Sequence, residues 1–274
     1  MTHGPSARLR NAVVVSAMTA ASLLPLGAAS AAPKAEVQTF ASPGDHAFTV
    51  PQGVRQIRIT ALGGAGGGGG GGGNNDGHLS GGGGGEGGGA AAVSCLVSVA
   101  GGSQIRLTVG RGGAGGQGGS GKNNDGASGG DGFTSYVGVP DPVIGFLPLA
   151  VAAHGHQGGG GDASGTWRSG FGSSGGAGGA ALGSMCMGAE HTLTPGNGGE
   201  GGAEGSSNHP GNGGLKGQPP EYPESCPDGT GAGGSGGRGA GNTGDIPHQE
   251  PSRPGEKGGD GCVVLTYTTH AGSS

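Results

Sequence analysis

The chain has 274 residues, of which 77 are glycine, and only 3% are aromatic. So few large apolar side chains exclude an ordinary globular core along the whole chain, and the composition is typical of low-complexity sequence. The formal net charge of −5 argues against nucleic acid and anionic membranes as partners. The glycines occur in blocks without a sustained G-X-Y period, which excludes a collagen triple helix.

Residues 1–31 are predicted to be an export signal. Arg8 and Arg10 precede an apolar run, and Ala29-Ser30-Ala31 supplies small residues for cleavage after Ala31. No later segment is long and apolar enough to span a bilayer. We therefore expect a secreted chain, extracellular or associated with the cell surface. Its predicted parts are a linker at 32–36, a single domain at 37–268 and a flexible tail at 269–274.

Short segments of alternating apolar and polar residues predict β-strands. In the segment 54–62, for example, Ile57, Ile59 and Ala61 fall on one face. No segment after the signal shows helical periodicity, so the predicted fold is all-β. The predicted strands are 37–40, 47–50, 54–62, 91–100, 104–109, 133–139, 149–153 and 262–268.

The connections between these strands carry three further predictions. Gly101-Gly102-Ser103 fits a tight reversal, which predicts a hairpin of the strands on either side. The proline-rich segment VPDPVIGFLP, at 139–148, is expected to connect the strand 133–139 to the strand 149–153. The region 154–261 shows almost no strand signal.

The glycine tracts lie between the strands, the first of them at 63–89. Glycine loses much backbone entropy on ordering and brings no apolar surface to offset that loss. Tracts held at both ends by a β-sandwich lose less, and they can pack as polyglycine II threads that have three residues per turn and bond to one another. We expect the blocks without other residues, such as 66–73, to occupy the middle of this lattice.

The four cysteines, in an exported chain, predict two disulfides. Three pairings are possible. We favour Cys95 with Cys262, both in predicted strands, and Cys186 with Cys226, both in glycine-rich loops. The gaps between the cysteines are too long for a four-cysteine metal site.

Several segments together resemble a known family. They are FTVPQGVRQIRITALGGAGGGGG, GGGAAAVSCLVSVAGGSQIRLTVGRGGAGG, PLAVAAHGHQGGGG and GGDGCVVLTY, between residues 40 and 268. The chain is similar to the glycine-rich domain of secreted bacterial proteins and phage tail adhesins, and to the extracellular module of the anaplastic and leukocyte tyrosine kinase receptors. The resemblance implies a small jelly-roll-like sandwich, similar to tumour necrosis factor, with polyglycine II threads and no catalysis. His154-Gly155-His156 departs from the family pattern, which continues in glycine.

Few residues suggest chemistry. His154 and His156, two apart in an extended segment, point the same way as metal ligands would, but we expect solvated loop histidines and no metal. The sequence GGDG occurs at 129–132 and 258–261, and because no lysine or helix follows, it favours a turn before a strand over a phosphate loop. No nucleophile elbow is present. We therefore expect no enzyme activity and no cofactor.

Three functions fit these features. The first is a secreted structural protein whose rigid lattice presents loops. The second is an adhesin-like module that binds a cell-surface or cell-wall component or a glycan, through the loops 74–80, 122–128 and 208–226. The third is an ice-binding protein, disfavoured because the side chains at every third position vary and form no uniform plane.

Overall fold

The computed structural model divides the chain into two units, Met1–Ala31 and Ala32–Ser274. The structure describes residues 34–74, 79–121, 123–165, 168–172, 179, 183–207, 209–242 and 249–269. The predicted export signal lies outside the described residues. Strand structure extends beyond both predicted ends of the domain. Lys34 to Glu36, expected in a linker, and Thr269, expected in a tail, belong to strands.

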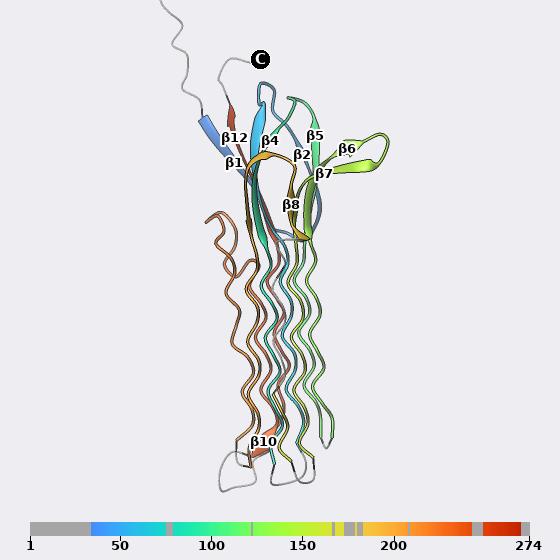
Figure 1. The fold of residues 1–274 in the computed structure, drawn as a ribbon, viewed down its shortest axis with the longest axis vertical. Coiled ribbons are helices and arrows are strands. Elements are labelled where there is room, and N and C mark those ends of the chain that lie inside the picture. Colours follow the sequence, from blue (N-terminus) through green and yellow to red (C-terminus); the bar gives the residue numbers. More distant parts are fainter. Residues whose placement is uncertain are drawn as a thin grey trace, which may run out of the picture. The chain divides into compact units, whose positions relative to one another are not determined.

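The fold is all-β, with two five-stranded antiparallel sheets (Figure 1). The first, sheet A, has the strand order β1-β12-β3-β4-β9, and the second, sheet B, has the order β2-β5-β6-β7-β8. A two-stranded ladder pairs β10 with β11. Sheet A comprises β1 (Lys34–Phe40), β12 (Cys262–Thr269), β3 (Gln56–Leu62), β4 (Ala92–Ser98) and β9 (Ala189–Thr194). Sheet B comprises β2 (Gly44–Thr49), β5 (Gln104–Val109), β6 (Ser135–Asp141), β7 (Gly145–Ala152) and β8 (Met185–Cys186), and the ladder comprises β10 (Gly241–Asn242) and β11 (Gln249–Glu250).

The hydrophobic core lies between the two sheets. The alternation predicted for 54–62 is confirmed, since Ile57, Ile59 and Ala61 are fully buried in this core. Ile105 and Leu107 of β5 meet them from sheet B. Burial of such side chains contributes roughly 1.5–3 kcal/mol each, so a few short strands supply the apolar surface that the glycine tracts lack.

One predicted connection is wrong, and another is shorter than expected. The segments 91–100 and 104–109 do not form a hairpin, because β4 pairs with β3 and β9 while β5 pairs with β2 and β6. The reversal at Gly101 and Gly102 instead carries the chain from one sheet to the other. The proline-rich segment 139–148 is the hairpin of β6 and β7, in which Asp141 pairs with Gly145.

The region 154–261 also contains strands that the sequence did not predict. They are β8, β9, β10 and β11. The strand β9 has the sequence AEHTLT and is mostly exposed at the edge of sheet A, so it lacks the apolar alternation that marks a half-buried strand.

The glycine tracts form extended threads that continue from the strands and lie side by side (Figure 1). In the thread 63–73, every amide donates to a carbonyl of another thread, and consecutive residues take three different partners in turn. Gly66 donates to Gly88, Gly67 to Gly130 and Gly68 to Glu256, before Gly69 returns to the first partner thread at Gly85. The pattern repeats every three residues, as expected for polyglycine II.

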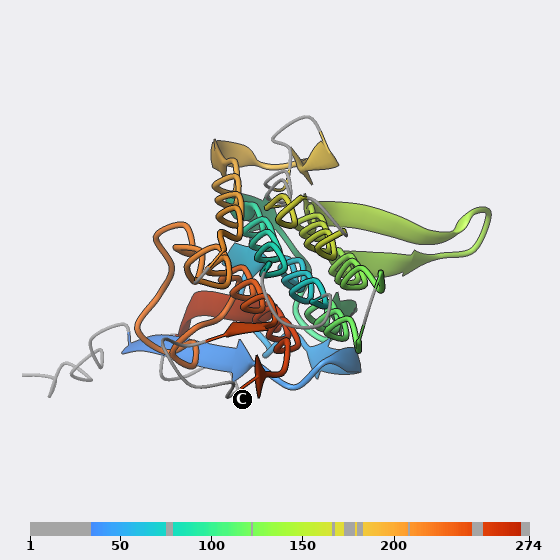
Figure 2. The same ribbon diagram turned by 90° about the horizontal axis from the view of Figure 1, so that it is seen from below.

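Three further threads donate to the carbonyls of the thread 63–73. In each of them, every third amide donates a hydrogen bond to a carbonyl of 63–73. Gly113 donates to Ala65, for example, and Gly116 donates to Gly68. These threads are 113–119, 155–161 and 234–240. The thread 63–73 therefore has six neighbouring threads. Three accept hydrogen bonds from its amides, and three donate hydrogen bonds to its carbonyls. The predicted central position of 66–73 is confirmed. Figure 2 views the threads from below, where each appears as a coil beside its neighbours.

The cysteine pairing differs from the prediction. Cys95 is bonded to Cys186, and Cys226 to Cys262. Cys95 faces the core from β4, whereas Cys262 belongs to a second buried cluster with Leu62 and Val264. The side chains of Cys95 and Cys262 therefore lie on opposite faces of sheet A, and β3 separates their strands. The first disulfide links the two sheets, and the second holds the segment around Cys226 against sheet A.

The described part of the chain contains no helix of the length and apolar character needed to cross a membrane.

Candidate functional site

Two neighbouring threads bring polar side chains together where they join sheet B. The thread 124–134 leads into β6, and the thread 153–162 leaves β7. Gly132 donates to the carbonyl of Gly155 (3.0 Å), and Gly129 to that of Gly158 (2.9 Å). The same antiparallel register pairs Ser135 with Ala152 in the sheet. It places Asp131 opposite His156.

The resulting cluster consists of Asp131, His154 and His156. Each offers one ligand atom, and these atoms all lie within 4.8 Å of one another. The Nδ1 atom of His156 lies 3.4 Å from Oδ1 of Asp131, and the two imidazole rings meet edge to face with their centroids 5.1 Å apart. Two imidazoles and a carboxylate in this arrangement can bind a cation or exchange a proton.

Two further groups orient this cluster. The Thr134 hydroxyl lies 2.9 Å from Nδ1 of His154. The backbone amide of Gln157 donates to Oδ1 of Asp131 at 2.9 Å. Both contacts come from the paired threads themselves, so the backbone register fixes the side chains.

The sequence identified the two histidines but missed Asp131 and Thr134. The departure of His154-Gly155-His156 from glycine does not interrupt the thread, because Gly155 donates to Gly64 and the His156 carbonyl accepts from Gly88. His154 is half-buried and bonded to Thr134, so it is not the freely solvated histidine that we expected. The signal for Asp131 was its GGDG sequence, but only the register shows which residue it faces.

The prediction of turns at the two GGDG sequences is wrong. Both lie in threads, and their aspartate side chains accept hydrogen bonds from backbone amides of neighbouring threads. Asp131 accepts from Gln157, and Asp260 accepts from the amide of Gly112 at 2.8 Å. Asp260 also pairs with Lys257 at 2.6 Å. These carboxylates therefore complete the hydrogen bonding of the lattice where the threads enter β6 and β12.

A groove runs beside the cluster, where the threads join the ends of β5 and β6. His154 and Asp131 line it together with Arg111, Phe133 and Tyr136. The Arg111 guanidinium lies 4.6 Å from the centroid of the Phe133 ring, a cation–π contact. The groove thus offers aromatic faces and a cation to a ligand.

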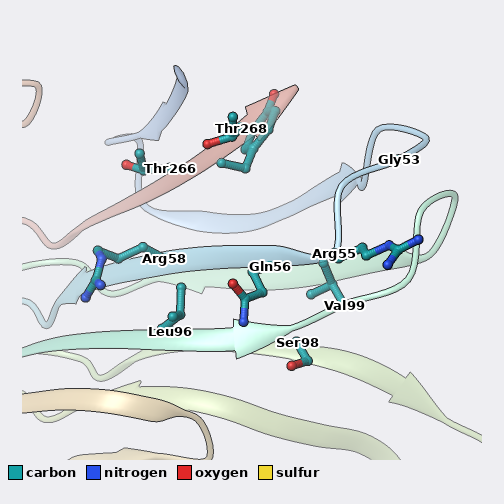
Figure 3. A pocket seen from close by; sticks show the side chains of 10 residues that line it. Gly53, Arg55, Gln56, Arg58, Leu96, Ser98, Val99, Thr266 and Thr268 are labelled. Carbon is teal, nitrogen blue, oxygen red and sulfur yellow. The ribbon is translucent and has the colours of Figure 1, made fainter. Parts of the chain in front are cut away.

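A second groove crosses the outer face of sheet A (Figure 3). Its lining includes Arg55, Gln56 and Arg58 of the β3 region and Ser98 of β4. Arg58 pairs with Glu190 at 2.7 Å. This surface can donate hydrogen bonds to a polar ligand.

Glu86 is the one charged residue in the thread 81–89, and it is only 3% exposed. Its Oε2 accepts the Glu200 amide at 2.8 Å. Burial raises the pKa of the Glu86 carboxyl above its usual value, and the hydrogen bond from Glu200 opposes this shift. The sequence did not single out Glu86.

The predicted contact loops are only partly described. Residues 75–78, 122 and 208 lie outside the described residues. In the loop 122–128, Asp125 accepts the amide of Ala163 at 2.7 Å, which fixes this loop against a neighbouring thread. The segment 208–226 begins as a thread, because Gly211 and Gly214 donate to Gly81 and Gly84. It is therefore not a loop over its whole length.

A family model, that of the glycine-rich domain, matches residues 40–268. No curated protein matches the chain.

Proposed function

Because the chain belongs to the glycine-rich domain family, we propose that it is a secreted, non-catalytic structural protein whose rigid bundle of threads presents surface loops. The observation that carries this proposal is the thread 63–73, in which every amide is bonded to another thread. A backbone bonded on all sides has little freedom to move, so it holds the loops at its ends in fixed positions.

Export and location are part of the proposal. The segment 1–31 has the features of a cleaved signal, and the cysteine pairs Cys95–Cys186 and Cys226–Cys262 suit an oxidising compartment. The expected product is a protein in the medium or on the cell surface that begins at Ala32. Terminal sequencing of the exported protein tests this start, and an uncleaved chain retained inside the cell would contradict it.

The structural role is tested by a search for a specific partner. The exported protein is applied to a glycan array and used in pull-downs from cell-wall and cell-surface fractions. A structural role predicts no saturable partner. Saturable binding of one glycan or one surface protein would replace it with the second candidate function.

That second candidate is an adhesin-like binding module, as the similarity to phage tail adhesins and receptor modules suggests. The favouring observation is the hairpin of β6 and β7, which projects beside the sheets (Figure 2). At its tip, Val143 is 89% exposed and Ile144 is 64% exposed. The side chain of Asp141 accepts both of their amides, at 2.8 Å and 2.9 Å, which fixes the shape of the tip.

Contiguous exposed apolar side chains mark contact surfaces, so the adjacent Val143 and Ile144 are the residues to test. Replacing Val143 and Ile144 by serine is expected to abolish any saturable binding found in the search. The matched control is Leu215→Ser, which removes another exposed apolar side chain, in the segment 208–226. Equal loss in both variants would exclude the hairpin as the contact surface.

A further inference from the structure

The cluster of Asp131, His154 and His156 has the composition of a transition-metal site. Its three ligand atoms lie within 4.8 Å of one another, whereas ligands of a bound zinc ion stand about 2.0–2.2 Å from the metal and therefore about 3–4 Å apart. The separation of 3.4 Å between His156 Nδ1 and Asp131 Oδ1 already falls in this range. The remaining separations, at most 4.8 Å, must shorten to about 3–4 Å when the ion binds.

The backbone around the cluster is fixed before any ion arrives. Gly132 and Gly129 bond the two threads on either side of Asp131, and the amides of Gly155 and Gly158 bond the second thread to the thread 63–73. A site on such a backbone loses little conformational entropy on binding. This distinguishes it from histidines scattered on a loop.

The surrounding hydrogen bonds also match those of metal sites. A metal-bound histidine commonly donates its other ring nitrogen to a neighbouring oxygen, and bound carboxylates are themselves hydrogen-bonded. Thr134 holds Nδ1 of His154, and the Gln157 amide holds Asp131. When Nδ1 of His154 donates to the hydroxyl, Nε2 carries the lone pair that a metal binds.

We propose that Asp131, His154 and His156 bind a divalent transition-metal ion of the zinc and copper class. Two imidazoles and one carboxylate suit these ions, whereas calcium and magnesium prefer oxygen ligands alone. The side chains of His156 and Asp131 are 51% and 50% exposed, so water or a group from another molecule completes the coordination. A plain ion pair this exposed contributes little to stability and does not explain the third residue.

The test is titration of the tag-free exported chain with Zn²⁺ and with Cu²⁺ in competition with a chelator of known affinity. We expect one site per chain, with Cu²⁺ bound more tightly than Zn²⁺. His154→Ala, His156→Ala and Asp131→Asn should each weaken binding by about tenfold or more. Asparagine keeps the oxygen that accepts the Gln157 amide, so Asp131→Asn removes the charge while the thread contact remains.

Two variants complete the design. Thr134→Val, which removes only the orienting hydroxyl, should weaken binding by about 10–100-fold and alter the nitrogen couplings in the Cu²⁺ electron paramagnetic resonance spectrum. His191→Ala, an exposed histidine of β9, should bind like the unaltered chain. The proposal is overturned if neither ion binds at a stoichiometry of one, or if binding is unchanged in the His154 and His156 variants.

Discussion

Gly71 illustrates why single residues in the threads must be glycine. Its amide donates to Arg253 at 3.0 Å, and its carbonyl accepts from Gly119 at 2.8 Å. A Cβ built at Gly71 would meet the backbone carbonyl of Arg238 closer than 3.0 Å. Gly71→Ala is therefore expected to lower the free energy of unfolding by about 1–3 kcal/mol or more, as measured by urea denaturation.

The control for this substitution is Gly165→Ala. A Cβ at Gly165 meets nothing within 4 Å. At such a site alanine should change the free energy of unfolding by less than about 1 kcal/mol, in the stabilising direction, because it restricts the unfolded chain. Equal destabilisation by both substitutions would contradict the packing described for the thread 63–73.

Glu86 predicts a dependence of stability on pH. Because burial raises the folded-state pKa of its carboxyl, folding favours the protonated form. The contribution of Glu86 to stability is fully present below the unfolded pKa, near 4.5, and is lost as the pH rises through the folded pKa. Compared with Glu86→Gln, the unaltered chain should thus gain stability as the pH falls from 7 to 4.

Denaturation of both chains at several pH values between 4 and 7 measures this difference. Glu204→Gln, at an exposed position, is the control and should follow the unaltered chain. A difference between the unaltered chain and Glu86→Gln that stays constant over this range, or that grows as the pH rises, would refute the argument.

Among the larger elements, the disulfides give the most direct test of the fold. Peptide mapping without reduction should recover Cys95 linked to Cys186 and Cys226 linked to Cys262. The second bond closes 36 residues, and in the chain-entropy account its loss in the double Cys226→Ser, Cys262→Ser variant costs about 3–4 kcal/mol. Recovery of a peptide that links Cys95 to Cys262 would refute the arrangement of sheet A.

The strands show what alternation can and cannot predict. The segment 104–109 was predicted with the bounds that the structure has, because Ile105, Leu107 and Val109 face a core. The pairing of that strand was wrong, since a short turn can join strands of one sheet or of two. The same limit explains the cysteines: alternation shows that Cys95 faces inward, but not which strand it meets there.

For the candidate site, the sequence does not reveal which threads are neighbours. The sequence shows His154 and His156 two residues apart, and the spacing alone suggested a common direction. Nothing in a run of glycines indicates which other run lies beside it, because no side chain marks the partner. Asp131 and Thr134 could therefore be assigned to the site only from the hydrogen-bond register.

At the scale of the whole domain, the bonded threads predict slow amide hydrogen exchange. The amides of 63–73 and 81–89 donate to other threads. They should be protected from exchange as strongly as the amides of β3 and β12, because threads and strands open only when the whole domain unfolds. The amides of Val143 and Ile144, which are bonded only to an exposed side chain at the hairpin tip, should exchange faster than the thread amides. Measurement on the mature chain decides this, and thread amides that exchange as in a short peptide would remove the basis of the proposed scaffold.

The repeat of three residues along the thread 63–73 also constrains how such a protein can change in length. One inserted residue would turn every following amide toward the wrong neighbour, whereas three would add a whole turn and restore the alignment. The amides and carbonyls of an added turn find partners only when the surrounding threads gain a turn as well. Insertions and deletions inside the bundle should therefore arise in triplets that several tracts share, while the connecting tips can grow one residue at a time.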